Sequence, residues 1–60
     1  DKADYVQQLT AQMNLPLTAV TVYSDSHLDL PILNLAGQAI AVSPDSQLKR
    51  VCQRKGWEII

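Results

Sequence analysis

Two carboxylates four residues apart, Asp25 and Asp29, lie in the polar stretch 23–29. The apolar run Leu17–Val22 precedes this stretch, and a second apolar segment, Leu30–Ala36, follows it. The carboxylates therefore fall where a buried strand is predicted to end and a helix to begin, which is where an α/β sheet presents ligand-binding groups. Carboxylate oxygens are ligands that a hard cation such as Mg2+ prefers. The loop is a candidate metal or phosphate site, although this spacing is common and unspecific.

The same loop has structural interpretations. Ser26 and Asp29 have the spacing of a helix capping box. Pro31 argues against a helix that begins at Ser26, because proline beyond the first turn removes a backbone hydrogen bond. If the helix begins at Asp29, Asp29 becomes its cap and Asp25 stays free in the loop. His27 is expected to face solvent rather than to act as an acid or base.

Two elements are predicted ahead of the loop. Residues 2–14 are predicted to form a helix that Pro16 prevents from continuing. Its apolar residues recur at spacings of three and four, and the stripe that they form is expected to pack in the core: Tyr5, Val6, Leu9 and Met13. Residues 18–23 are rich in β-branched side chains and are predicted to form a strand.

A longer helix is predicted near the end of the chain. Ser43 can cap it, Pro44 suits the first helical position, and Asp45 favours the positive end of the helix dipole. The helix is predicted to run to Lys55 and to stop at Gly56. Three apolar residues are expected on its buried side: Leu48, Val51 and Cys52.

The remaining elements complete an alternating order. A short helix is predicted over residues 29–36, a second strand over 39–42 and a third strand over 57–60. Strands that are joined by helical crossovers must be parallel. The sequence therefore predicts a single α/β unit over residues 1–60, with a three-stranded parallel sheet.

Composition limits the classes of function. With one cysteine, Cys52, the chain has no internal disulfide, and Cys52 and His27 do not form a zinc set. The net charge is −1, so the basic residues near the end of the chain (Lys49, Arg50, Arg54 and Lys55) are interpreted as a solvated helix face, and nucleic-acid binding through them ranks last. No signal peptide and no membrane-spanning run of roughly 20 apolar residues is visible, and a single reduced cysteine fits a cytoplasmic protein.

The strand over 18–23 raises a question about the edge of the sheet. If the strands pair in sequence order, this apolar strand lies at an edge, and neither charge nor proline blocks it. Two occupants are considered: the remainder of a longer parent chain, or a second copy of this chain in a homodimer.

The pattern of residues resembles the C-terminal part of haloacid dehalogenase-like hydrolases, in the phosphoserine-phosphatase-like branch. The matching segments cover nearly the whole chain: Tyr23-Ser24-Asp25-Ser26, Asp29-Leu30-Pro31-Ile32-Leu33, Ala36-Gly37, Ala39-Ile40-Ala41-Val42-Ser43-Pro44-Asp45, Leu48 and Gly56-Trp57. The resemblance implies a Rossmann-like core and a Mg2+-binding acidic loop. It makes Asp25 a direct metal ligand, and Asp29 a residue that holds the metal's water or orients its neighbours. Lys2, at the head of the first helix, would neutralise the phosphate.

This sequence departs from the family pattern in two ways. It contains no Asp-x-Asp motif, which carries the family's nucleophile, so we expect the chain to be inactive alone. Leu28 stands where relatives often carry a polar residue, and a polar contact to phosphate would be lost. The leading interpretation is a part of a Mg2+-dependent phosphatase that acts on a phosphorylated small molecule. The alternative is a non-catalytic interaction module that dimerises through the open sheet edge.

Overall fold

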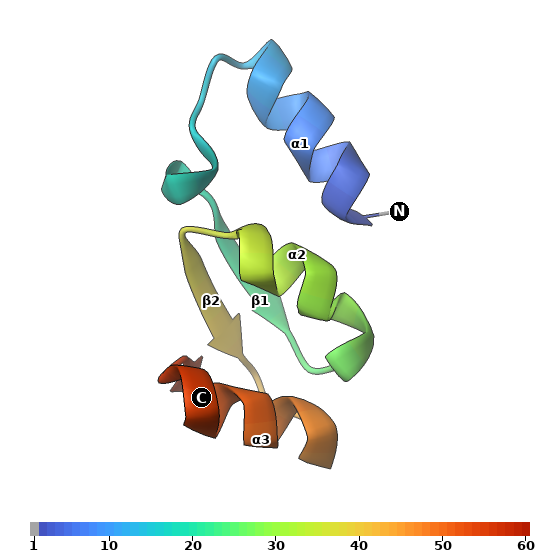
Figure 1. Ribbon diagram of the computed structural model, residues 1–60, viewed down its shortest axis with the longest axis vertical. Helices are drawn as coiled ribbons and strands as arrows, with labels where there is room; N and C mark the ends of the chain where they lie inside the picture. The colour runs from blue at the N-terminus through green and yellow to red at the C-terminus, as the bar shows by residue number, and fades with distance from the viewer. Residues whose placement is uncertain (1) are drawn as a thin grey trace.

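The computed structural model describes residues 2–60. In this part of the chain the α-helices are α1 (Lys2–Gln12), α2 (Leu30–Leu35) and α3 (Ser46–Lys55). The strands are β1 (Thr21–Ser24), β2 (Gln38–Ala41) and β3 (Glu58–Ile59). Two short 3-10 turns precede β1 and α2, namely η1 (Leu17–Ala19) and η2 (His27–Asp29). Figure 1 shows α1 extending away from the sheet and α3 lying at the opposite end of the molecule.

The sheet is parallel, with its strands in the order β1-β2-β3. Ser24 at the end of β1 pairs with Ala41 at the end of β2, so the carboxyl ends of these strands lie level. Helix α2 connects β1 to β2, and α3 connects β2 to β3, so both connections move across the sheet in the same direction. Right-handed connections of this kind place α2 and α3 on the same face of the sheet. The predicted α/β class and three-stranded parallel sheet are confirmed.

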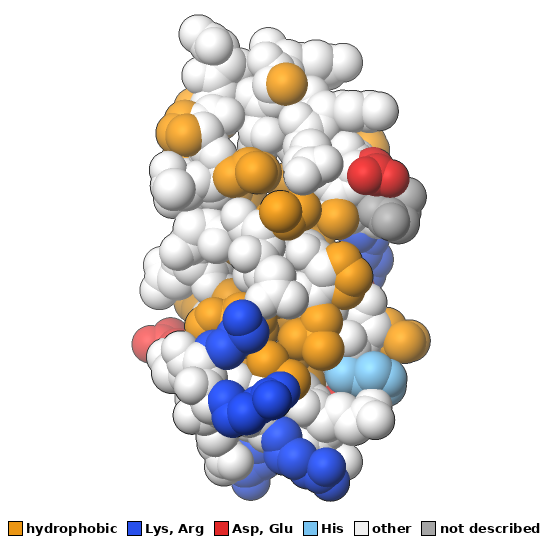
Figure 2. Space-filling view, viewed as in Figure 1, with side chains coloured by type: hydrophobic (Ala, Val, Ile, Leu, Met, Phe, Trp, Pro, Cys, Tyr) orange, Lys and Arg blue, Asp and Glu red, His pale blue; other side chains and the backbone are white. Residues whose placement is uncertain are grey.

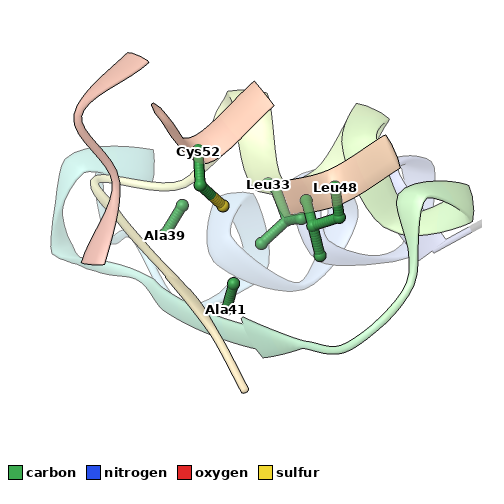
Figure 3. Packing of buried hydrophobic residues seen from close by; sticks show 5 residues of the cluster. All are labelled: Leu33, Ala39, Ala41, Leu48 and Cys52. Carbon is green, nitrogen blue, oxygen red and sulfur yellow. The ribbon is translucent and has the colours of Figure 1, made fainter. Parts of the chain in front are cut away.

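The core lies between this face and the two helices. Leu33 of α2 and Leu48 and Cys52 of α3 are fully buried, and they pack over Ala39 and Ala41 of β2 (Figure 3). The small alanine side chains allow the helices to approach β2 closely. The expected buried side of α3 is confirmed for Leu48 and Cys52, whereas Val51 is only half-buried.

The predicted strand over 18–23 is wrong in its first half. Leu17–Ala19 form a 3-10 turn, in which the N–H of Ala19 bonds to the carbonyl of Pro16 and the N–H of Val20 to the carbonyl of Leu17. The Leu17 carbonyl also accepts the N–H of Gly37, at 3.0 Å. These bonds to neighbouring backbone override the preference of this segment for extended structure.

The first helix also differs from its prediction. It ends at Gln12, and Asn14 adopts the left-handed conformation that stops it (φ 58°). The helix packs mainly against α2. The stripe that was expected in the core is largely exposed, with Tyr5 64%, Leu9 39% and Met13 59% exposed.

The start of α3 lies further along than predicted. Asp45, not Ser43, is the cap, because its side chain accepts the N–H of Leu48 at 2.8 Å. Ser43 has a positive φ of 43°, and its N–H bonds to the carbonyl of Ile60 instead. The predicted end of α3 is confirmed, since Gly56 is the left-handed C-terminal residue (φ 76°).

The two glycines differ in what an added methyl group would meet. In Gly37→Ala the new Cβ would overlap the backbone of Thr18, which cannot rotate away. In Gly56→Ala the Cβ meets open space, and only the left-handed backbone is strained, by about 1 kcal/mol. We expect urea unfolding followed by circular dichroism to show a larger loss of stability for Gly37→Ala, by about 2 kcal/mol or more. Equal losses would contradict this account of the Gly37–Thr18 contact.

Candidate functional site

The carboxylate of Asp29 is held from two sides at the carboxyl end of β1. Lys2 Nζ lies 3.0 Å from Asp29 Oδ1, and Ser24 Oγ donates a hydrogen bond of 2.6 Å to Asp29 Oδ2. The Lys2–Asp29 contact joins two residues that are 27 positions apart in the sequence. It connects the start of α1 to the turn before α2. Both oxygens of Asp29 are therefore engaged, and the head of α1 is fixed to the acidic loop.

These contacts stabilise the ionised form of Asp29. The hydrogen bond from Ser24 is the largest cause that lowers its pKa, and the bond and charge of Lys2 add to it, against a smaller opposing effect of burial. The side chain of Asp29 is 19% exposed, whereas that of Lys2 is 73% exposed. Water screens the lysine, which explains why the buried hydroxyl has the greater effect.

Asp25 occupies a different environment in the same loop. Asp25 is exposed, and its side chain has no hydrogen-bond or ion-pair partner among residues 2–60. Its backbone carbonyl accepts the N–H of Asp45 at 3.0 Å, which fixes the position of the loop. The Asp25 carboxylate is consequently available to an external ligand, whereas that of Asp29 is committed to its neighbours.

A second carboxylate fixes the loop from the side of α3. Asp45 Oδ2 lies 2.9 Å from both the backbone nitrogen and Nδ1 of His27, and Oδ1 accepts the N–H of Leu48. These bonds lower the pKa of Asp45 to about 2, with the backbone bond from His27 as the largest cause. The side chain of His27 is 40% exposed, so it reaches solvent as expected, and its Nδ1 also lies 2.9 Å from Asp45 Oδ2.

The loop is also ordered from within. Ser26 Oγ accepts the N–H of Leu28 at 3.1 Å, so Ser26 caps the 3-10 turn η2. Asp29 occupies the cap position of α2, but its side chain makes no capping bond. The capping box with Ser26 and the cap by Asp29 were the two predicted roles, and each is fulfilled only in part. The Asp29 carboxylate instead accepts hydrogen bonds from Lys2 and Ser24. Sequence reasoning missed Ser24, although its position at the end of the first predicted strand was a signal.

A groove opens beside the Lys2–Asp29 pair. Its volume is about 430 Å³, and its lining residues are Lys2, Ala3, Leu28, Asp29, Pro31 and Ile32. A larger hollow of about 640 Å³ runs along α3, where Lys and Arg side chains gather (Figure 2), and it contains no residue of the acidic loop. In the part of the chain that the structure describes, no cluster of three or more His, Cys, Asp or Glu side chains forms a metal site, and none of the helices is suited to crossing a bilayer.

Replacing each partner of Asp29 tests the origin of its lowered pKa. Both Ser24→Ala and Lys2→Met remove a bond that favours the carboxylate, so both raise the pKa of Asp29. The rise is expected to be larger in Ser24→Ala, because the hydroxyl bond is the leading cause. The carboxyl carbon shift of Asp29, followed by NMR across acidic pH, measures both values. A larger rise in Lys2→Met would contradict this order.

The Asp45 bonds predict a dependence of stability on acidic pH. The folded-state pKa of about 2 lies below the ordinary value of 3.8. The stabilisation is therefore complete above about pH 4 and is lost as the pH falls toward 2. Asp45→Asn is expected to lower the urea midpoint at neutral pH and to flatten the decline between these limits. Glu58→Gln on β3 is the control. If stability falls between about pH 4 and about pH 2 as steeply in Asp45→Asn as in the unchanged chain, Asp45 is not the cause of the acid sensitivity.

Comparison with known proteins finds relatives that are named as a hydrolase and as a phosphatase. The chain is 45% identical over 58 residues to a protein of Mycobacterium leprae named as a hydrolase, and 43% identical over 58 residues to a phosphoserine phosphatase of Mycobacterium tuberculosis. Each alignment covers 97% of this chain and 19% of the relative. The chain thus spans about a fifth of the length of these curated relatives. No family model matches it.

The fold is shared with a solved structure. A crystal structure of a protein of unknown function from Bordetella pertussis superposes with a TM-score of 0.85 at 35% identity. The superposition covers 98% of this chain and 28% of that protein. Similarity in sequence and in fold extends over nearly all of the chain, including the acidic loop. Over nearly all of its length the chain is therefore similar to one segment of proteins that are named as hydrolases and phosphatases, which is consistent with its resemblance to the haloacid dehalogenase-like phosphatases.

Proposed function

We propose that this chain forms the cation-binding and phosphate-neutralising segment of a Mg2+-dependent phosphatase, which hydrolyses a phosphomonoester through an aspartyl-phosphate. The observation that carries the proposal is the Lys2–Asp29–Ser24 contact, in the loop that also carries the exposed carboxylate of Asp25. The names of the two relatives, a hydrolase and a phosphoserine phosphatase, support it.

Lys2 suits the neutralisation of a phosphate. Phosphoryl transfer spreads negative charge over the oxygens of the transferred group, and a fixed cation stabilises it. An ammonium group has three N–H donors, and the contact with Asp29 engages one oxygen partner. The group is 73% exposed, so its other N–H donors can reach an anion in solvent. Asp29 in this arrangement positions Lys2 rather than reacting itself.

The donor set also fits a magnesium ion. Proteins usually hold Mg2+ through one or two carboxylates, and water and phosphate oxygens fill the other positions. Asp25 is free to bind the ion directly, whereas both oxygens of Asp29 already accept hydrogen bonds. Asp29 is therefore suited to holding a metal-bound water or a neighbouring group. When bound, the ion would supply further positive charge for the phosphate.

The covalent step requires an aspartate that the sixty residues do not provide in an Asp-x-Asp motif. We expect this chain alone to lack turnover and the nucleophile to come from another part of the parent protein. β1 is an edge strand, and Tyr23 on it is 61% exposed. This edge suits a strand of the parent protein. It also leaves open the alternative function, a non-catalytic module that pairs with a second copy.

Binding of Mg2+ to the chain tests the role of Asp25. Asp25→Asn removes the free carboxylate, so the affinity for Mg2+ measured by calorimetry is expected to fall by about tenfold or more. Glu58→Gln is the matched control, since it also removes one negative charge but lies at the other edge of the sheet. An equal loss in both variants would indicate a general charge effect and would count against the proposed metal ligand.

Two further measurements on the same sample separate the alternatives. Hydrolysis of p-nitrophenyl phosphate with Mg2+ at an enzyme-like rate would contradict the expected inactivity of the chain. Sedimentation of the chain as a tight dimer, together with no Mg2+ binding, would favour the interaction module.

A further inference from the structure

We propose that the groove beside Lys2 and Asp29 accepts the apolar part of a phosphate monoester, and that Leu28 determines this preference. The inference rests on the proposed function and adds to it the class of substrate: esters of compact apolar alcohols or phenols. It stands on the lining of the groove, on the exposure of Leu28 and on the position of the Lys2 cation.

The groove has the size and the lining of a small-molecule site. Its volume of about 430 Å³ lies within the range of roughly 300–1,000 Å³ that ligand pockets occupy. Lys2 and Asp29 contribute the charged part of the lining, and the apolar part comes from Ala3, Leu28, Pro31 and Ile32. A ligand with one anionic end and one apolar end matches this division.

Leu28 is the most exposed of the large apolar side chains in residues 2–60, at 76%. A rigid loop holds it there. Its own N–H bonds to Ser26, its neighbour His27 is bound to Asp45, and its neighbour Asp29 is bound to Lys2 and Ser24. These bonds hold the backbone at Leu28 in place, so its side chain is presented at the groove. A ligand that covers it removes apolar surface from water at little cost in ordering the loop.

The charge in the groove selects the anionic end of the ligand. The exposed ammonium of Lys2 retains N–H donors for a phosphate oxygen. Leu28 directly precedes Asp29, the partner of Lys2, so the apolar side chain and the cation line the same groove although they come from η2 and α1. A leucine offers no hydrogen bond to a hydroxyl, amino or carboxyl group of a substrate, and such groups would lose their water in contact with it. The position therefore favours an apolar group next to the phosphate.

Ligand titrations of the isotope-labelled chain in Mg2+ test the inference, with phenyl phosphate and inorganic phosphate as probes. Phenyl phosphate is expected to bind about tenfold more tightly and to shift the amide signals of Ala3, Leu28 and Ile32. In Leu28→Asn the ratio of the two dissociation constants is expected to fall toward one. Leu15→Asn is the matched control, because Leu15 is an exposed leucine outside the groove lining, and it should keep the ratio.

The possible outcomes distinguish this inference from the proposed function. Equal affinities for the two probes, or an unchanged ratio in Leu28→Asn, would overturn the inference and leave the phosphate role of Lys2 intact. If neither probe shifts the signals of Lys2 and Asp29, the proposed function fails together with the inference. Tighter binding of phenyl phosphate that depends on Leu28 supports both.

Discussion

The two hydrogen bonds to the Asp29 carboxylate are the constraint on which the site depends. They connect the first residue of α1, the last residue of β1 and the turn that leads into α2. Helix α1 packs mainly against α2 and exposes most of its apolar stripe, so its packing alone positions it weakly. The ion pair gives the start of α1 a defined place, and Lys2 is consequently held at the acidic loop.

The loop is fixed from two sides, and this determines which side chains are free. Asp45 at the start of α3 binds His27, and Lys2 and Ser24 bind Asp29. The residues between and beside these anchors, Asp25 and Leu28, point to solvent. A rigid loop that exposes one carboxylate and one apolar side chain is prepared to meet a ligand, because little conformational entropy is left to lose.

The sequence predicted the fold better than it predicted the ends of the elements. Alternating apolar runs, together with Gly56 and Pro16, were enough to predict three helices, three parallel strands and the end of α3. The errors at 18–23 and at Ser43 have different causes. At 17–19 local backbone bonds to Pro16 and Leu17 form a turn, and the Leu17 carbonyl also accepts the N–H of Gly37. At Ser43 the backbone N–H bonds to the distant carbonyl of Ile60.

The sequence alone determined the order of the elements and the position of Asp25 and Asp29 after the first strand, because these follow from periodicity and from the chemistry of turns. Only the tertiary structure decided that Asp29 is paired while Asp25 is free, that His27 belongs to Asp45, and that the α1 stripe is exposed. Hydrogen bonds between residues 18 or 27 positions apart depend on how the helices cross the sheet, and local residue patterns do not contain that information.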